Sequence, residues 1–434
     1  MPARQSPNPP AQLFERHIAD AVREALADTP VVCLRGPRQT GKTTLAQHLA
    51  NGSPPRAYVT LDDDATRAAA QADPVGFLAG LPGAATIDEV QRAPELALAL
   101  KAAVDADRRP GRFLLTGSAG GPLWAPFAEA LVGRMETHTL WPLSQGELAG
   151  VRETFVERAF AADLTAIGTP QPSGAPPQAS LQPKTPRQLL ATRLCAGGFP
   201  EAVARKARRR QAWFDAYVEG ITQRDIRDLA SIARGPELSR LLAMLASRAS
   251  QPVNFADLSR SLSIPQTSLK RYVTLFEATF LIRFLPAWTA NIGKRLVKAP
   301  KLIFTDPGLL AHLLGTDPDR LDANPTLFGP ALENLVAAEL GKQLGWSAKQ
   351  CRLHHFRTHS GIEVDLVLES SAGDIVGIEV KAGASLHPSA ARGLRTLADL
   401  AGSQFVCGII LYTGTASVPF GNRIHALPIG ALWA

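Results

Sequence analysis

Short apolar runs alternate with amphipathic stretches over the first 150 residues of the chain. Residues 31–34, 84–87 and 112–117 are short and largely apolar, a pattern typical of buried parallel strands. Residues 44–49 have the pattern of a helix, and residues 137–141 are apolar and prone to form a strand. Strands that alternate with helices predict an α/β fold built on a parallel sheet.

A helical periodicity governs the segment 237–288. Leucines recur at helical spacing where it begins, at Leu238, Leu241, Leu242 and Leu245. Residues 254–258 begin a short helix with an N-cap, 263–265 form a turn, and 266–276 are a second amphipathic helix. The apolar residues 280–285 follow as a strand. This order predicts a winged helix-turn-helix, which either lays its second helix in a DNA major groove or contacts protein.

The last third of the chain contains a predicted β-hairpin. Residues 361–368 and 375–381 alternate like strands, and a polar turn separates them. Glu379 and Lys381 stand two residues apart, so their side chains share one face of the strand. The hairpin brings Asp365 beside Glu379, which predicts a cluster of two acids and one lysine.

Composition narrows the class of protein. A chain of 434 residues, 45% hydrophobic, predicts two to four domains. Its apolar runs fall short of the roughly 20 residues of a membrane span, and residues 1–10 lack the apolar stretch of a secretion signal, so we expect a cytoplasmic protein without membrane contact. Four separated cysteines without a C-x-x-C pair predict no disulfide framework. The net charge of +7 permits binding to nucleic acid or to an acidic partner.

The segment after the first strand carries the most specific chemistry. It fits G-x-x-x-x-G-K-[ST], the phosphate-binding loop of nucleoside triphosphatases, as Gly36-Pro37-Arg38-Gln39-Thr40-Gly41-Lys42-Thr43. A strand, a glycine loop and a helix point backbone N–H groups at a phosphate. We expect this loop and Thr44 to bind ATP, with Lys42 on the β- and γ-phosphates and the Thr43 hydroxyl on Mg²⁺.

Polar residues at the ends of the next two strands complete a nucleotide site. Asp88 and Glu89 follow the second strand, and we expect Asp88 to hold Mg²⁺ and Glu89 to activate the attacking water. We expect the third strand to lie between the loop and Asp88, so that Thr116 or Ser118 senses the γ-phosphate. Arg134 is either a surface charge or a group that stabilises the transition state, in its own subunit or in a neighbour's within a homo-oligomer.

These segments carry a family resemblance. G-P-R-Q-T-G-K-T-T, T-I-D-E-V-Q-R-A-P-E-L, L-L-T-G-S and L-V-G-R resemble the bacterial and archaeal AAA+-type ATPases of an uncharacterised family with a C-terminal domain of unknown function. Further matches lie at residues 197–200, 224–226, 301–310 and 332–340. The resemblance implies a P-loop AAA+-type ATPase core, a helical and winged-helix middle and a C-terminal α/β domain with a nuclease-like fold, and it implies no known cellular role.

The acid and lysine cluster is similar to the PD-(D/E)xK nuclease motif, with Val364 in place of its proline. In that interpretation Asp365 and Glu379 hold a second Mg²⁺, and Lys381 stabilises developing charge or orients water. Glu333, on the helix that opens this domain, falls where some members place a further acid. The alternative is a decayed nuclease fold that is kept as a binding module.

The expected organisation is a disordered tail at 1–10, an ATPase core at 11–150, a helical lid at 151–235 with a Pro-rich insertion at 164–186, a winged helix-turn-helix at 236–305 and the C-terminal domain at 306–434. The winged helix offers five side chains to DNA: Gln266, Thr267, Ser268, Lys270 and Arg271. Two uses of ATP compete: a gated nucleic-acid enzyme that cuts, and a regulatory switch that binds protein or DNA without cutting.

Overall fold

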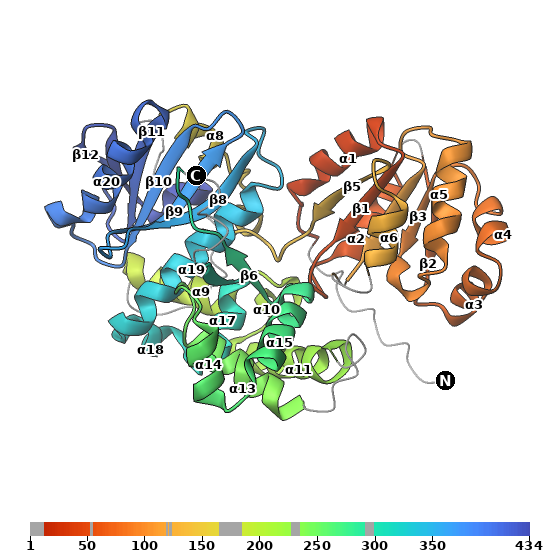
Figure 1. The fold of residues 1–434 in the computed structure, drawn as a ribbon, viewed down its shortest axis with the longest axis horizontal. Coiled ribbons are helices and arrows are strands. Elements are labelled where there is room, and N and C mark those ends of the chain that lie inside the picture. The colour runs from red at the N-terminus through yellow and green to blue at the C-terminus, as the bar shows by residue number, and fades with distance from the viewer. Residues whose placement is uncertain are drawn as a thin grey trace, which may run out of the picture.

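The computed structural model describes residues 13–52, 55–118, 120, 124–164, 185–226, 235–290 and 299–434. The predicted tail and most of the predicted Pro-rich insertion lie outside these residues. The described chain forms two α/β parts and a helical part. Figure 1 shows the two sheets side by side, with the helical part below them. The predicted α/β architecture is confirmed.

The N-terminal part is built on a five-stranded parallel sheet. Its order is β2 (Ala57–Thr60), β3 (Ala85–Asp88), β4 (Phe113–Gly117), β1 (Val31–Arg35) and β5 (Met135–Thr139). Each neighbouring pair of strands runs parallel. The strand after Asp88 therefore lies between the glycine loop and Asp88, as the sequence predicts.

Helices cover both faces of this sheet because its three central strands, β1, β3 and β4, are buried on both sides. In β1, Val32 and Leu34 pack with α1 (Ile18–Asp28) and α2 (Lys42–Ala50). Val31 and Cys33 point to the other face, where they share a core with the next four helices. These helices are α3 (Asp64–Ala72), α4 (Pro74–Ala79), α5 (Leu96–Ala106) and α6 (Ala125–Ala130).

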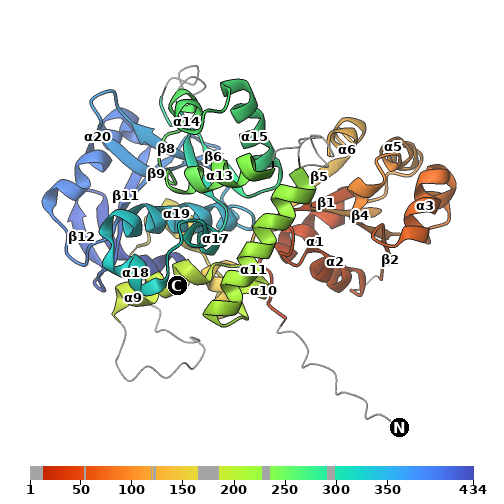
Figure 2. The ribbon, with the colours of Figure 1, turned by 90° about the horizontal axis from the view of Figure 1, so that it is seen from below.

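The helical part encloses its own core. It comprises α10 (Pro200–Val203), α11 (Ala207–Gly220), α13 (Gly235–Ala246), α14 (Phe255–Leu262), α15 (Gln266–Ala278), β6 (Ile282–Leu285), β7 (Lys301–Phe304) and α17 (Pro307–Leu313). The Asn254 side chain caps α14, as predicted, by accepting hydrogen bonds from the N–H groups of Ala256 and Asp257. β6 and β7 form an antiparallel pair. Figure 2 shows this part from below, with α11, α13 and α15 in view.

The C-terminal part is a six-stranded sheet between helices. Its order is β12 (Val418–Gly421), β13 (Ile424–Pro428), β11 (Phe405–Tyr412), β10 (Ile375–Lys381), β9 (Glu363–Ser370) and β8 (Cys351–Arg357). The predicted hairpin is confirmed as the antiparallel pair β9 and β10. One face of the sheet packs on α19 (Pro325–Gln343) and the other on α20 (Arg392–Ala401).

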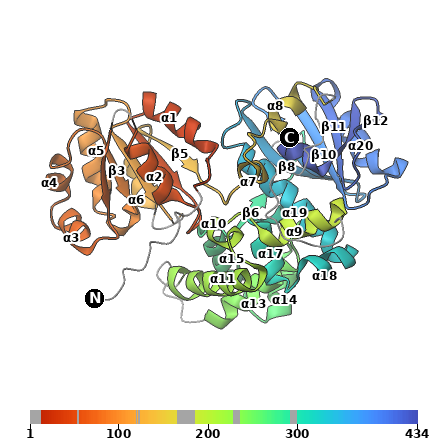
Figure 3. The ribbon, with the colours of Figure 1, turned by 180° about the vertical axis from the view of Figure 1, so that it is seen from behind.

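Two helices that precede the helical part in the sequence pack against the C-terminal sheet. After α7 (Gln145–Ala149), α8 (Phe155–Phe160) and α9 (Pro186–Ala196) pack in the same core as α19, and α18 (Pro318–Ala323) contributes Leu321 to that core. Figure 3 shows α8 and α9 beside the C-terminal sheet. All four cysteines are free thiols, and no helix among the described residues is long and apolar enough to cross a membrane.

Candidate nucleotide site and C-terminal acid cluster

The glycine loop joins β1 to α2 along a path that two glycines permit. Gly36 packs against the backbone just after β5. A Cβ at this position would lie 2.2 Å from the Leu140 carbonyl oxygen. Gly41, the N-cap of α2, has a φ of 92°, which favours glycine. The loop therefore leaves the first N–H groups of α2 at its mouth, where a phosphate is bound in nucleotide-binding loops.

Lys42 is buried within this loop, with 4% of its surface exposed. Its Nζ donates to the carbonyl oxygens of Gly36 at 3.1 Å and Pro37 at 2.7 Å. Burial lowers the pKa of Lys42 to about 8, and the nearby acids Glu89 and Asp88 offset only part of this effect. The loop thus holds a cation whose charge is weakly stabilised until an anion arrives.

Asp88 is the centre of a hydrogen-bond network at the end of β3, and only 2% of its surface is exposed. Its Oδ2 accepts from the Thr43 hydroxyl at 3.0 Å and from the Tyr58 hydroxyl at 2.9 Å, and its Oδ1 accepts from Thr116. A carboxylate and a hydroxyl beside a phosphate loop are oxygen donors that suit Mg²⁺. The predicted pair Thr43 and Asp88 therefore fits the metal that accompanies ATP.

Glu89 follows in a backbone conformation that is rare for a residue other than glycine, with a φ of 56°. Its N–H donates to the Thr116 hydroxyl at 3.0 Å, and its carboxylate accepts from Ser118 at 2.7 Å. The amide of Gln91 donates to the other carboxylate oxygen. Ser118 and Gln91 therefore hold the predicted water-activating carboxylate in one orientation, and Thr116 fixes the backbone of Glu89.

Arg134 lies at the wrong edge of the sheet to serve its own subunit. Met135, the first residue of β5, pairs with Val31 at the start of β1, whereas the glycine loop follows the end of β1. The guanidinium of Arg134 instead makes two hydrogen bonds to Asp105, at 2.7 and 3.0 Å. Its predicted role within the same chain is wrong, and its role in a neighbour's site stays a prediction.

Arg16 is a contact of the loop that the sequence did not reveal. It precedes α1, and its guanidinium donates to the carbonyl oxygens of Thr40 and Trp141, each at 2.7 Å, and to Glu147 at 3.0 Å. It therefore ties the glycine loop to α7. A single arginine before an amphipathic helix has no sequence pattern that identifies it as a partner of a loop 24 residues away.

The predicted DNA-contacting helix presents its polar face to solvent. Gln266, Thr267, Lys270 and Arg271 are exposed and Ser268 is half-buried. The opposite face of α15 packs into the helical core through Leu269, Tyr272, Val273 and Phe276. The chain between β6 and β7 at 291–298 lies outside the described residues.

The other end of α15 meets the nucleotide-binding part. The Gly120 N–H, two residues after Ser118, donates to the Ala278 carbonyl oxygen at 2.8 Å. Phe280 packs edge-on against Trp141, with the ring centroids 5.8 Å apart. Gly120 is therefore in direct contact with the helical part.

The structure brings together the four predicted residues of the C-terminal cluster. Glu333 comes from α19, Asp365 from β9, and Glu379 and Lys381 from β10. Asp365 Oδ2 accepts from the Val380 N–H at 2.8 Å, and Lys381 Nζ lies 2.5 Å from Glu379 Oε1. Desolvation and the Asp365 charge raise the pKa of Glu379 to about 7.

A second lysine, one not predicted for this cluster, lies among these acids. Lys301 Nζ lies 2.6 Å from Glu333 Oε1 and 3.8 Å from Asp365 Oδ1. Desolvation, followed by the Asp365 charge, raises the pKa of Glu333 to about 8. Among the described residues there is no group of three or more His, Cys, Asp or Glu side chains that could hold a metal. As packed, the cluster does not fit the predicted Mg²⁺ at Asp365 and Glu379, because lysine ammonium groups already pair with its carboxylates.

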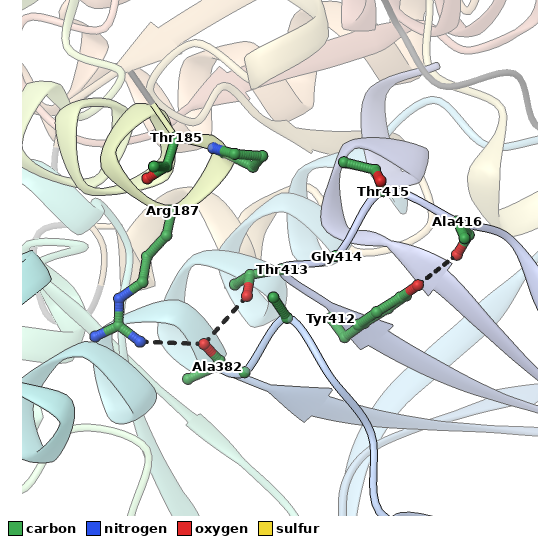
Figure 4. Close-up of a pocket in the computed structure, with 11 residues that line it drawn as sticks. Thr185, Arg187, Ala382, Tyr412, Thr413, Gly414, Thr415 and Ala416 are labelled. Carbon is green, nitrogen blue, oxygen red and sulfur yellow. Dashed lines mark hydrogen bonds between the residues drawn. The ribbon is translucent and has the colours of Figure 1, made fainter. Parts of the chain in front are cut away.

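A cavity of about 410 Å³ lies beyond the carboxyl ends of β10 and β11. Its lining includes Thr185, Arg187, Ala382, Tyr412 and Thr413. Figure 4 shows Arg187 and Thr413 both bonded to the Ala382 carbonyl oxygen, and the Tyr412 hydroxyl bonded to the Ala416 carbonyl oxygen. Arg187 also pairs with Asp322 at 2.8 Å. These polar groups are engaged within the protein, so the cavity adds no candidate for catalysis.

Comparisons with known families match three successive stretches of the chain. Residues 28–149 match a family described as an AAA domain. Residues 187–320 match a domain of unknown function, DUF8612, and residues 328–432 match another, DUF4143. The nucleotide site described above therefore lies within an AAA domain, and the acid cluster lies mainly within a domain without an assigned function.

Whole-chain relatives come from mycobacteria. The uncharacterized proteins Rv2008c of Mycobacterium tuberculosis and Mb2031c of Mycobacterium bovis are each 35% identical over 421 residues, which is 96% of this chain and 84% of theirs. Among solved structures, a single-residue variant of Thermotoga maritima RuvB gives a TM-score of 0.28 at 17% identity, over 62% of this chain and 89% of that one. The RuvB Holliday junction branch migration motor of the same organism gives 0.27 at 17% identity, over 62% and 87%. Because both TM-scores are low, neither structure supports an inference about the fold or the function of this chain.

Proposed function

This chain belongs to the family of those mycobacterial proteins and carries an AAA-type ATPase domain, and from that premise we propose that it hydrolyses ATP with Mg²⁺ to drive a conformational switch. The observation that carries the proposal is the network at the carboxyl ends of three neighbouring strands. There the loop lysine, the Asp88 carboxylate and the oriented Glu89 carboxylate converge on one edge of the sheet. Phosphoryl transfer needs these three kinds of group together.

Each group has a defined task. Lys42 exchanges the carbonyl oxygens of Gly36 and Pro37 for the β- and γ-phosphates when ATP enters. Thr43 and Asp88 hold Mg²⁺, which neutralises phosphate charge. Glu89 accepts a proton from the attacking water, and the Ser118 hydroxyl keeps its carboxylate oriented.

The segment after β4 is the proposed link between ATP turnover and the rest of the chain. Ser118 contacts Glu89, and Gly120 contacts the Ala278 carbonyl at the end of α15. Loss of the γ-phosphate changes what surrounds Ser118, and the hydrogen bond from Gly120 passes that displacement to the helical part. The Arg16 bonds to Thr40 and Glu147 form a second mechanical link.

The test replaces Glu89 with glutamine. An amide cannot accept the proton, so Glu89→Gln should bind ATP as the parent does and release phosphate about a hundredfold more slowly, the usual scale of a general base. The matched control is Glu95→Gln, at an exposed glutamate six residues away. Parent-like turnover by Glu89→Gln would refute the assignment of the base.

A second function, DNA binding by a winged helix-turn-helix, is supported by the exposed polar face of α15. Lys270→Ala combined with Arg271→Ala should weaken duplex binding and lower the slope of log K against log salt by about 0.9 for each lost phosphate contact. The control is Arg208→Ala with Arg209→Ala, an exposed basic pair on α11. If both pairs change the slope equally, or the parent binds no duplex at low salt, the module instead contacts protein.

For the C-terminal domain we favour a binding role over nucleic-acid cleavage in the packing described. The ammonium groups of Lys301 and Lys381 on its acids support that choice, because a metal-dependent nuclease needs those carboxylates for the ion. Plasmid DNA incubated with the full chain, Mg²⁺ and ATP should remain supercoiled. Nicking that is lost on Asp365→Ala would restore the nuclease interpretation.

A further inference from the structure

Gln91 lies beside the proposed base, two residues further along the chain. It belongs to the short 3₁₀ helix η1 (Val90–Arg92), and its Nε2 donates to Glu89 Oε2. A carboxylate only accepts hydrogen bonds, so this contact fixes which end of the amide faces Glu89. The amide nitrogen is therefore committed to the base, and the amide oxygen is left for another donor.

The amide oxygen of Gln91 is a buried acceptor without a donor. Gln91 Oε1 has no hydrogen-bond partner among the residues that the structure describes. A buried acceptor in this condition costs free energy, and an apolar side chain of the same shape would avoid the cost. Unpaired buried polar atoms are rare in folded proteins, and a catalytic role is one of the reasons that explain them.

This oxygen lies over the end of β4, between the glycine loop and the base. A Cβ added to Gly117, the last residue of β4, would lie 3.0 Å from Gln91 Oε1. Gly117 pairs with Arg35, the residue that precedes the glycine loop, and β4 lies between β1 and β3 in the sheet. In the proposed complex with ATP, the γ-phosphate and the water that attacks it belong to this edge of the sheet.

An aromatic wall shields the same place from solvent. The Cβ added to Gly117 would also lie 3.0 Å from Trp124 Cζ3. Only 4% of Trp124 is exposed, and its ring stacks on Phe127 with the centroids 5.2 Å apart. A hydrogen bond formed beside such a wall is stronger than one in water, because the local dielectric is low and bulk water does not compete.

We propose that Gln91 is a second catalytic residue of the ATPase: its Oε1 accepts one hydrogen bond from the attacking water while the Glu89 carboxylate accepts the other. The amide nitrogen of Gln91 is bonded to Glu89, so the amide oxygen and the carboxylate lie within reach of a single water. Two acceptors fix both O–H bonds of that water and turn its lone pair towards the γ-phosphorus.

The two residues have different tasks in this step. The water oxygen forms a bond to the γ-phosphorus as the bond from phosphorus to the ADP oxygen breaks, and one proton of the water passes to Glu89. Gln91 takes no proton, because an amide oxygen is a far weaker base than a carboxylate, and it only orients the water. The inference rests on the proposed ATP hydrolysis, since it adds a residue to that site.

Binding of two nucleotide complexes to the full chain with Mg²⁺ tests the proposal. ATPγS mimics the ground state, whereas ADP with aluminium fluoride mimics the transition state with the water in line. Gln91→Met keeps the length of the side chain and removes both polar groups. It should bind ATPγS as the parent does and bind the aluminium fluoride complex about tenfold more weakly, the scale of one hydrogen bond.

The matched control is Gln71→Met, at an exposed glutamine whose Nε2 donates to the Arg92 carbonyl oxygen of the same 3₁₀ helix. It should leave both affinities unchanged. The urea midpoint of nucleotide-free Gln91→Met should stay close to that of the parent, because the variant removes an unpaired buried acceptor. A lower midpoint together with an equal loss of affinity for both complexes would overturn the proposal in favour of a structural role.

A double-mutant cycle separates contact with the water from an effect exerted through the base. In the Glu89→Gln background, Gln91→Met should still weaken binding of the aluminium fluoride complex. If it has no further effect there, Gln91 only holds the Glu89 carboxylate and the proposal is wrong. A parent that binds neither complex refutes the proposed ATP hydrolysis and this role with it. A parent that binds both, with a Gln91→Met variant of equal affinities, refutes the role of Gln91 alone.

Discussion

Raising the pH should weaken ATP binding in a way that reports on one buried lysine. Lys42 must be charged to hold the phosphates, yet burial in the loop lowers its pKa to about 8. The phosphates of bound ATP restore the charge by offering it anionic partners. Below pH 8 the free protein already carries the proton, and above pH 8 ATP binding must take a proton up from solvent.

The size of the effect follows from the charged fraction of Lys42. With a pKa of about 8, the charged fraction falls from about nine-tenths at pH 7 to about one-tenth at pH 9. If the complex keeps the proton throughout, the dissociation constant should rise about tenfold between these values, or about 1.4 kcal/mol. Proton uptake on binding should rise over the same interval from near zero to about one.

Calorimetry at pH 7, 8 and 9, in two buffers with different ionisation enthalpies, measures both quantities. Lys42→Met, which keeps the length of the side chain and removes the charge, should bind weakly and show no such rise in uptake. Affinity and proton uptake that stay constant in the parent would show that Lys42 remains charged in the free protein up to pH 9, which would refute the reasoning.

Three other substitutions test contacts made by Tyr58, Glu333 and Arg134. Tyr58→Phe removes one donor to Asp88 and should lower the free energy of unfolding of the nucleotide-free chain by about 1.5 kcal/mol in urea titrations; an unchanged midpoint would mean that solvent replaces the hydroxyl. Burial raises the pKa of Glu333 to about 8, so the folded protein binds this proton more tightly than the unfolded chain does. The stabilisation that this proton provides is therefore lost as the pH rises from about 5 towards 8. Glu333→Gln should make the free energy of unfolding depend less on pH in this range, as measured by urea titrations at several pH values. Arg134→Ala should leave the affinity for ATP unchanged. If Arg134 serves a neighbouring subunit, phosphate release per chain should rise with protein concentration in the parent and not in the variant. A parent rate that does not depend on protein concentration would show that Arg134 is a surface residue.

The features predictable from sequence are those in which neighbouring residues act together. The glycine loop needs its glycines at set spacings, because the backbone itself turns around the phosphate, so Gly36 and Gly41 can be found without a structure. Asp88 and Glu89 follow an apolar strand, and strand ends in a parallel sheet gather at one edge. The alternation in β9 and β10 likewise predicts, from the sequence alone, that Asp365 lies beside Glu379.

Other parts of the site depend on which elements meet across the fold, and the linear pattern carries no record of that. Tyr58 reaches Asp88 because β2 and β3 are neighbours, and Arg16 reaches the loop only because α1 packs against β1 and β5. Arg134 follows a suggestive motif, yet the parallel register of β1 and β5 places it at the far edge. Lys301 is one basic residue among 46 in the sequence. It becomes the cation of the acid cluster because tertiary packing sets β7 against α19 and β9, where burial makes a paired charge far more favourable than an isolated one.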